Sequence, residues 1–104
     1  MCWKIIYKLQ KEREKMNWVF DIEPRAHFSR YIFGSAVYSD TPSDIDVAII
    51  YDKKYVGVKE AIDYRRELVK EMMKISSMTI DTILLSKEEE IEMSFLENAK
   101  CIEF

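Results

Sequence analysis

The segment FGSAVYSDTPSDIDVAII, residues 33–50, decides the fold of this chain. Asp44 and Asp46 stand one residue apart and lead into the apolar run VAII, so a core strand begins with two carboxylates. Side chains alternate along a strand, so the two acids project from one face, with Cα atoms about 6.5–7 Å apart. Ile45 and Val47 project from the other face. The pattern predicts a strand with one buried face and paired acids at its leading end.

Paired carboxylates repel each other, and burying one without a partner costs several kcal/mol, so the pair calls for solvent or a cation. Mg²⁺ prefers one or two carboxylates and completes its shell with water and substrate phosphates. Asp81, amid the apolar segment MTIDTILLS, supplies a third acid on a second strand. Gly34 and Ser35 form a turn at which backbone N–H groups can approach a phosphate. The combination predicts a site for a nucleoside triphosphate with magnesium.

Outward from this segment, the hydrophobic periodicity predicts alternating helices and strands. Ser86 followed by Glu89 is a capping box that opens the last helix. The expected order is a helix over residues 3–16, strands over 28–33, 44–51 and 78–86, a loop over 37–43, and helices over 58–75 and 87–99. This order predicts an α/β or α+β domain.

Length and composition limit the other possibilities. At 104 residues the chain holds one domain, with residues 1–27 as a helix and connector and residues 28–104 as the core. A net charge of −3 and a pI near 5.2 argue against general binding of nucleic acid or anionic lipid. No stretch of about 20 apolar residues is present, so we expect no membrane span and a cytoplasmic location.

The two cysteines, Cys2 and Cys101, lie near opposite ends of the chain, and neither belongs to a CxxC pair. With His27 as the only histidine, they do not form a zinc site of normal composition. For a cytoplasmic chain we expect both thiols to be reduced.

Three motifs together resemble the nucleotidyltransferase fold of the DNA polymerase β superfamily. They are "FGS", the "DID" that begins nine positions after Ser35, and the later "TIDTILL" with its single acid. The chain is most similar to the minimal nucleotidyltransferases of the antitoxin type. The resemblance implies a small mixed β-sheet packed with helices, and it implies a C-terminal helix for FLENAKCIEF.

The resemblance also implies a role for each motif residue. The nucleotide-binding residues would be Gly34, Ser35 and Ser43. The catalytic carboxylates would be Asp44, Asp46 and Asp81, which would hold two Mg²⁺ ions, with Asp81 helping to activate an attacking hydroxyl. ATP would be the substrate and pyrophosphate the leaving group, with positioning and metal electrostatics supplying most of the catalysis.

The resemblance also implies that a partner protein accepts the transferred nucleotide, because so small a catalytic core has little surface left to bind an acceptor. The expected partner is a helical HEPN-type toxin that receives AMP, in a toxin–antitoxin pair that can form a hetero-oligomer. Many minimal members follow Gly-Ser with Ala-Arg-Gly, whereas this chain reads GSAVYSD. A catalytically silent module that neutralises its partner by contact alone therefore remains the alternative.

Purely structural roles for the single residues also stay open. The acids can be polar strand edges, and Ser35 can be a helix N-cap. The basic residues that flank the motif strands can contact phosphate or only solvent; they are Arg25, Arg30, Lys53 and Lys54.

Overall fold

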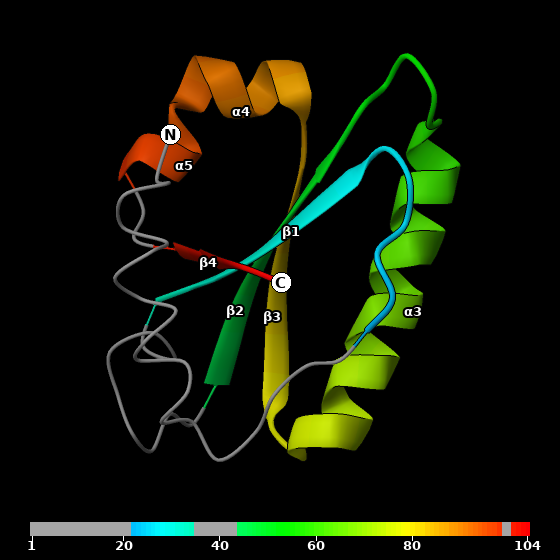
Figure 1. Ribbon diagram of the computed structural model, residues 1–104, viewed down its shortest axis with the longest axis vertical. Helices are drawn as coiled ribbons and strands as arrows, with labels where there is room; N and C mark the ends of the chain where they lie inside the picture. The colour runs from blue at the N-terminus through cyan, green and yellow to red at the C-terminus, as the bar shows by residue number, and fades with distance from the viewer. Residues whose placement is uncertain (1–21, 35–43, 99–100) are drawn as a thin grey trace.

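The computed structural model describes residues 22–34, 44–98 and 101–104. The predicted N-terminal helix over residues 3–16 and the loop over 37–43 lie outside these ranges. The described elements are β1 (Phe28–Phe33), β2 (Asp44–Tyr51), α3 (Val58–Ser76), β3 (Thr79–Ser86), α4 (Lys87–Met93), α5 (Phe95–Asn98) and β4 (Cys101–Glu103). They confirm a small mixed α/β fold (Figure 1).

The sheet has four strands in the order β3-β2-β1-β4. β1 pairs antiparallel with both β2 and β4, whereas β2 and β3 run parallel. A parallel pair needs a crossover connection, and α3 supplies it. The β2–α3–β3 unit therefore sets two parallel strand starts side by side at one end of the sheet (Figure 1).

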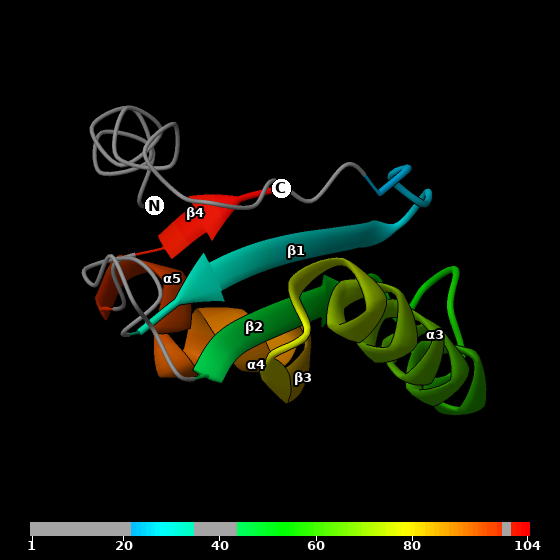
Figure 2. The ribbon, with the colours of Figure 1, turned by 90° about the horizontal axis from the view of Figure 1, so that it is seen from below.

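The side chains of β2 alternate between two apolar clusters, one on each face of the sheet, which favours a strand. Ile45, Val47 and Ile49 are fully buried on the face that α3 covers, where they pack with Leu68 and Met72. Ala48 and Ile50 are buried on the opposite face, in a cluster with Leu85, Leu96 and Cys101. Figure 2 shows α3 on one side of the sheet and α4 with α5 on the other. Burial on both faces explains the unbroken apolar run after Asp46.

α3 spans 19 residues and buries a narrow stripe formed by Ala61, Tyr64, Leu68 and Met72. This spacing is that of one helical face. Val58 and Met73, which the periodicity placed on that face, are 62 % and 48 % exposed. The helix ends at Ser77, whose left-handed backbone lets its N–H donate to the Met73 carbonyl.

The predicted capping box is confirmed at the start of α4. The Glu89 N–H donates to the Ser86 hydroxyl at 3.2 Å, and the Ser86 N–H donates to Glu89 Oε1 at 2.9 Å. The prediction of one continuous helix beyond this point is wrong. Ser94 adopts a left-handed conformation with φ 48°, which ends α4 and separates it from the four-residue α5.

The C-terminal helix implied for FLENAKCIEF is also wrong in its last part. Cys101–Glu103 forms β4, which pairs with β1 in the register Tyr31–Glu103, Ile32–Ile102 and Phe33–Cys101. Ile102 becomes fully buried in the α3-side core as a result. Pairing along the edge of β1 decides the conformation of this segment.

Cys101 is fully buried and disulfide-bonded, so the expectation of a reduced thiol is wrong for this residue. No helix among the residues that the structure describes combines the length and apolarity needed to cross a membrane.

Candidate active site

A single row of residues crosses all four strands at one end of the sheet. Cys101 of β4 lies opposite Phe33 of β1, Phe33 lies opposite Asp46 of β2, and Asp46 lies beside Asp81 of β3. The row runs from a buried, disulfide-bonded cysteine to an exposed acid. The strand pairing thus brings together two acids that are far apart in the sequence.

The third acid, Asp44, precedes Asp46 by one pleat on the same strand, in register with Thr79. Asp44 and Asp46 are half-buried and Asp81 is exposed. All three share the sheet face of Ala48 and Ile50, because side chains alternate along each strand. They occupy the end of that face where the apolar cluster stops.

Burial and the neighbouring carboxylates raise the pKa of Asp46 above its ordinary value. Burial is the largest cause, followed by the negative charge of Asp81 and then that of Asp44. Within residues 22–34, 44–98 and 101–104, none of the three carboxylates forms an ion pair with a lysine or arginine. The acids therefore form an uncompensated negative site, which a cation would stabilise.

Gly34 lies directly against this site in a backbone conformation that favours glycine. Its φ is +75°, a left-handed conformation that other residues rarely adopt. A Cβ atom built there would collide with Oδ2 of Asp46. The backbone at the end of β1 thus directly abuts the Asp46 carboxylate.

Ser35 and Ser43, the other predicted nucleotide-binding residues, lie outside the described part of the chain. The structure brings together Gly34, Asp44, Asp46 and Asp81, and it leaves these two serines as predictions.

The acid site fits a hard divalent cation in its donor chemistry. Carboxylate oxygens are the ligands that Mg²⁺ prefers, and the backbone of Gly34, which carries no side chain, lies directly against the Asp46 carboxylate. No three histidine, cysteine or acidic side chains in the described ranges already converge tightly enough to hold a metal ion. Asp44, Asp46 and Asp81 are the residues that would hold Mg²⁺, which would supply positive charge to this site.

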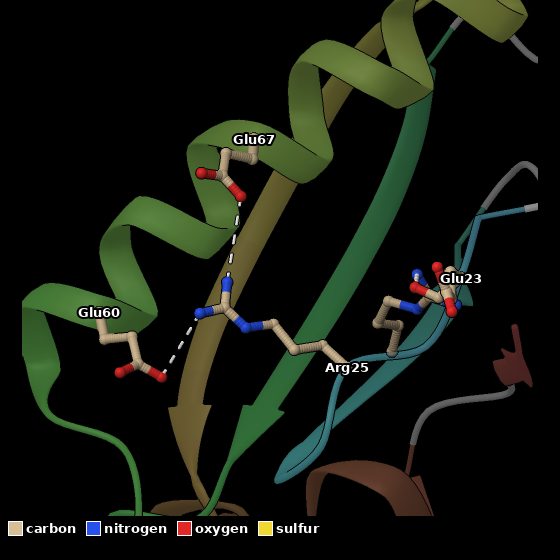
Figure 3. A network of polar contacts seen from close by, with 5 residues as sticks. Glu23, Arg25, Glu60 and Glu67 are labelled. Atoms are coloured by element: carbon tan, nitrogen blue, oxygen red, sulfur yellow. Dashed lines mark hydrogen bonds and ion pairs between the residues drawn. The ribbon is translucent and has the colours of Figure 1, made fainter.

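The two candidate arginines do not face this site. Arg25 ion-pairs with Glu60 at 3.7 Å and with Glu67 at 4.0 Å, and Figure 3 shows its side chain reaching toward α3. Arg30 is 4 % exposed and donates to the carbonyl oxygens of Phe104 and Ile22 at 3.0 and 2.9 Å. Both arginines therefore make structural contacts on the α3 side of the sheet.

The two candidate lysines also lie away from the acids. Lys53 and Lys54 are exposed and follow the C-terminal end of β2, opposite to the end that carries Asp44. Phosphate contact by these lysines is therefore not supported.

An aromatic pair beside the acids was missed by sequence reasoning. The rings of Phe33 and Phe95 meet edge to face, with centroids 5.2 Å apart. Phe33 is the cross-strand neighbour of Asp46, so this pair forms the apolar wall of the site. The "FGS" motif marked Phe33, but no local pattern connects it to Phe95, 62 residues later in the chain (95 − 33).

Comparison with known proteins bears on the reaction class. The family described as "Polymerase beta, Nucleotidyltransferase" matches residues 7–103, which is nearly the whole chain and begins well before Phe28. Neither the curated proteins nor the solved structures gave a match. The acid row and its glycine turn thus agree with the family match, and the chain belongs to the polymerase β nucleotidyltransferase family.

Proposed function

We propose that this nucleotidyltransferase domain transfers AMP from ATP to a hydroxyl group of a partner protein in the cytoplasm. The observation that carries the proposal is the register that sets Asp46 beside Asp81, with Gly34 against the Asp46 carboxylate. The family match supports nucleotidyl transfer as the reaction class.

The geometry supports a division of labour among the site residues. Asp44 and Asp46, together on β2, would hold Mg²⁺, which supplies positive charge against the triphosphate. The backbone at Gly34 can approach a phosphate closely because it carries no side chain. Asp81 lies beside this pair on the adjacent strand and is exposed, so an acceptor hydroxyl can reach it.

The reaction is an in-line displacement at the α-phosphorus. The acceptor oxygen forms a bond to this phosphorus, the bond to the bridging oxygen breaks, and pyrophosphate leaves. Asp81 takes the acceptor proton as the hydroxyl attacks, which is the role of a general base. Positioning and electrostatics supply most of the rate in such transfers.

A protein is the favoured acceptor because the net charge of −3 and the pI near 5.2 do not favour general binding of nucleic acid. The partner we propose is a helical HEPN-type toxin, with this chain as its antitoxin in a hetero-oligomer.

The direct test is transfer of label from α-³²P-ATP to a purified HEPN-type partner in the presence of Mg²⁺. We expect labelling by the wild type, none without Mg²⁺, and loss in Asp46→Asn and Asp81→Asn. Asp63→Asn, an exposed acid on α3, is the matched control and should label normally. Full labelling by Asp46→Asn would contradict the catalytic assignment.

A contact-only module is distinguished by a triple variant. If Asp44, Asp46 and Asp81 are all replaced by Asn and neutralisation of the partner persists in full, contact alone accounts for the function. The absence of three converged ligands among the described residues is the observation that keeps this alternative in view.

A further inference from the structure

A cavity lies on the same sheet face as the acid row but apart from it. It encloses about 310 Å³. The strands contribute Ser29, Tyr31 and Ile50, and the helices contribute Lys87, Glu90, Ile91 and Leu96. None of the acid-site residues lines it. The Phe33–Phe95 pair belongs to the same apolar cluster as Tyr31 and Leu96, so it lies between this cavity and Asp46.

The wall of this cavity includes an apolar side chain that is open to solvent. Ile91 on α4 is 72 % exposed, the highest value among the large apolar residues that the structure describes. Met93, two residues further, is 54 % exposed. The buried side chains of Leu96 and Ile50 line the same cavity beside Ile91. Such a concave apolar site with an exposed aliphatic rim can receive one large apolar side chain.

The segment Ser86–Asn98, which forms the helical wall of this cavity, carries mostly negative charge. Lys87 is the only base in Ser86–Asn98, and it is already paired with Asp52 at 3.4 Å. The acids of the same segment are Glu88, Glu89, Glu90, Glu92 and Glu97. α3, on the other side of the sheet, mixes both signs along its length.

Two acids, one from α4 and one from β4, lie at the cavity. Glu90 lines it, and Glu103 of β4 lies opposite Tyr31 in the β1–β4 register. Burial raises the pKa of Tyr31, and the negative charges of Glu103 and Glu90 raise it further. Both carboxylates are therefore near the phenol that forms the cavity floor.

We propose that this surface, defined by Tyr31, Glu90, Ile91, Leu96 and Glu103, binds a basic amphipathic segment of a protein partner. An aliphatic or aromatic side chain would enter the cavity beside Ile91. Lysines or arginines on the flanks of the segment would meet Glu90 and Glu103, which is electrostatic complementarity of the kind that selects partners.

The charge pattern also decides against other occupants. Phosphate backbones and anionic lipid headgroups carry the same sign as the glutamates around the cavity and are repelled. A neutral apolar segment would leave those glutamates without compensation. This surface is on the face that carries Asp46 and Asp81, so a segment bound there is held on the reactive side of the sheet. Binding does not require transfer, and the two proposals are tested separately.

The test uses the full chain without nucleotide and a fluorescein-labelled peptide of about 18 residues, with Leu at helical spacing and Lys elsewhere. A second peptide replaces every Lys by Glu. Fluorescence anisotropy should show binding of the basic peptide, weakening as salt is added, and no binding of the acidic one. Glu90→Lys and Ile91→Asp should each weaken binding roughly ten-fold or more.

Asp63→Lys makes the same charge change as Glu90→Lys on the α3 side of the sheet and should leave the affinity unchanged. Thermal melts confirm that each variant is folded. Equal binding of the two peptides, no binding of the basic peptide up to about 1 mM, or equal weakening by Asp63→Lys would overturn the proposal. Binding should persist in Asp46→Asn, which separates this result from the outcome of the transfer assay.

Discussion

Asp46 and Asp81 lie side by side in the parallel pair β2–β3, although 35 positions separate them in the sequence (81 − 46). Each is the third residue of its strand, and α3 is the connection that joins the two strands. The β2–α3–β3 unit therefore builds the negative site by its register alone. The repulsion between the two carboxylates raises the pKa of Asp46 beyond the effect of burial.

Asp46→Asn should abolish transfer without harming the fold. The change removes a half-buried charge that Asp81 and Asp44 repel, so the melting temperature should equal or exceed that of the wild type. Loss of a metal-binding carboxylate should lower the transfer rate by about 10²-fold or more. Thermal melts and the labelled-ATP assay measure the two effects.

The same variant tests metal binding without catalysis. A ligand that binds only the native state raises its stability, so added Mg²⁺ should raise the melting temperature of the wild type. Asp46→Asn should show a much smaller rise. An equal rise in both proteins would place the Mg²⁺ elsewhere.

Gly34→Ala should cost both stability and transfer. The residue has φ +75°, and its new methyl group would strike the Asp46 carboxylate. We expect a loss of about 1–3 kcal/mol in the free energy of unfolding, measured by urea denaturation. Gly57→Ala is the control, because nothing lies within 4 Å of its Cβ position and its φ is −76°. The control should lose at most about 1 kcal/mol as an N-cap change, and its transfer should be normal.

Arg30→Ala should be the most destabilising of these changes. The buried guanidinium donates to Phe104 and Ile22 and lies 4.8 Å from the Phe104 ring centroid. Its removal takes these hydrogen bonds and the ring contact from the fold, which should cost about 2–4 kcal/mol. Arg66→Ala, at an exposed position on α3, should change the stability by less than about 0.5 kcal/mol. Similar urea midpoints for the two variants would contradict a structural role for Arg30.

Glu89→Gln should reduce the loss of stability in acid. The Ser86 N–H lowers the pKa of Glu89 below its ordinary value of 4.5 in the folded protein. A depressed pKa stabilises the fold above the unfolded value, and that contribution is lost as the pH falls through the folded value. The difference in melting temperature between wild type and Glu89→Gln should therefore be larger at about pH 7 than at about pH 3. Glu92→Gln, on the exposed surface of the same helix and outside the capping box, is the matched control.

Much of the fold followed from local patterns in the sequence. The alternation in DIDVAIIY and the periodicity of VKEAIDYRRELVKEMMKIS predicted β2 and α3, and the capping box fixed the start of α4. β4 was missed because CIE becomes a strand by pairing with β1, about 70 residues earlier, and no local signal encodes that pairing. The break at Ser94 was missed because a left-handed serine carries no compositional mark.

The candidate site divides in the same way. The spacing of Asp44 and Asp46 placed both acids on one face, and the later apolar strand marked Asp81. The directions of Arg25 and Arg30 could not be predicted, because partners on α3 and at Phe104 decide where the guanidinium groups lie. Phe95 reaches Phe33 only through tertiary packing.

The acid row also protects the alignment of the strands that form it. A slip of β3 by one residue would turn Asp81 from its open face into the core of Ile45, Leu68 and Met72. Burying an unpaired carboxylate there would cost several kcal/mol, so misaligned pairings are strongly disfavoured. The residues proposed to act on ATP thus help to select the one strand alignment in which they can act.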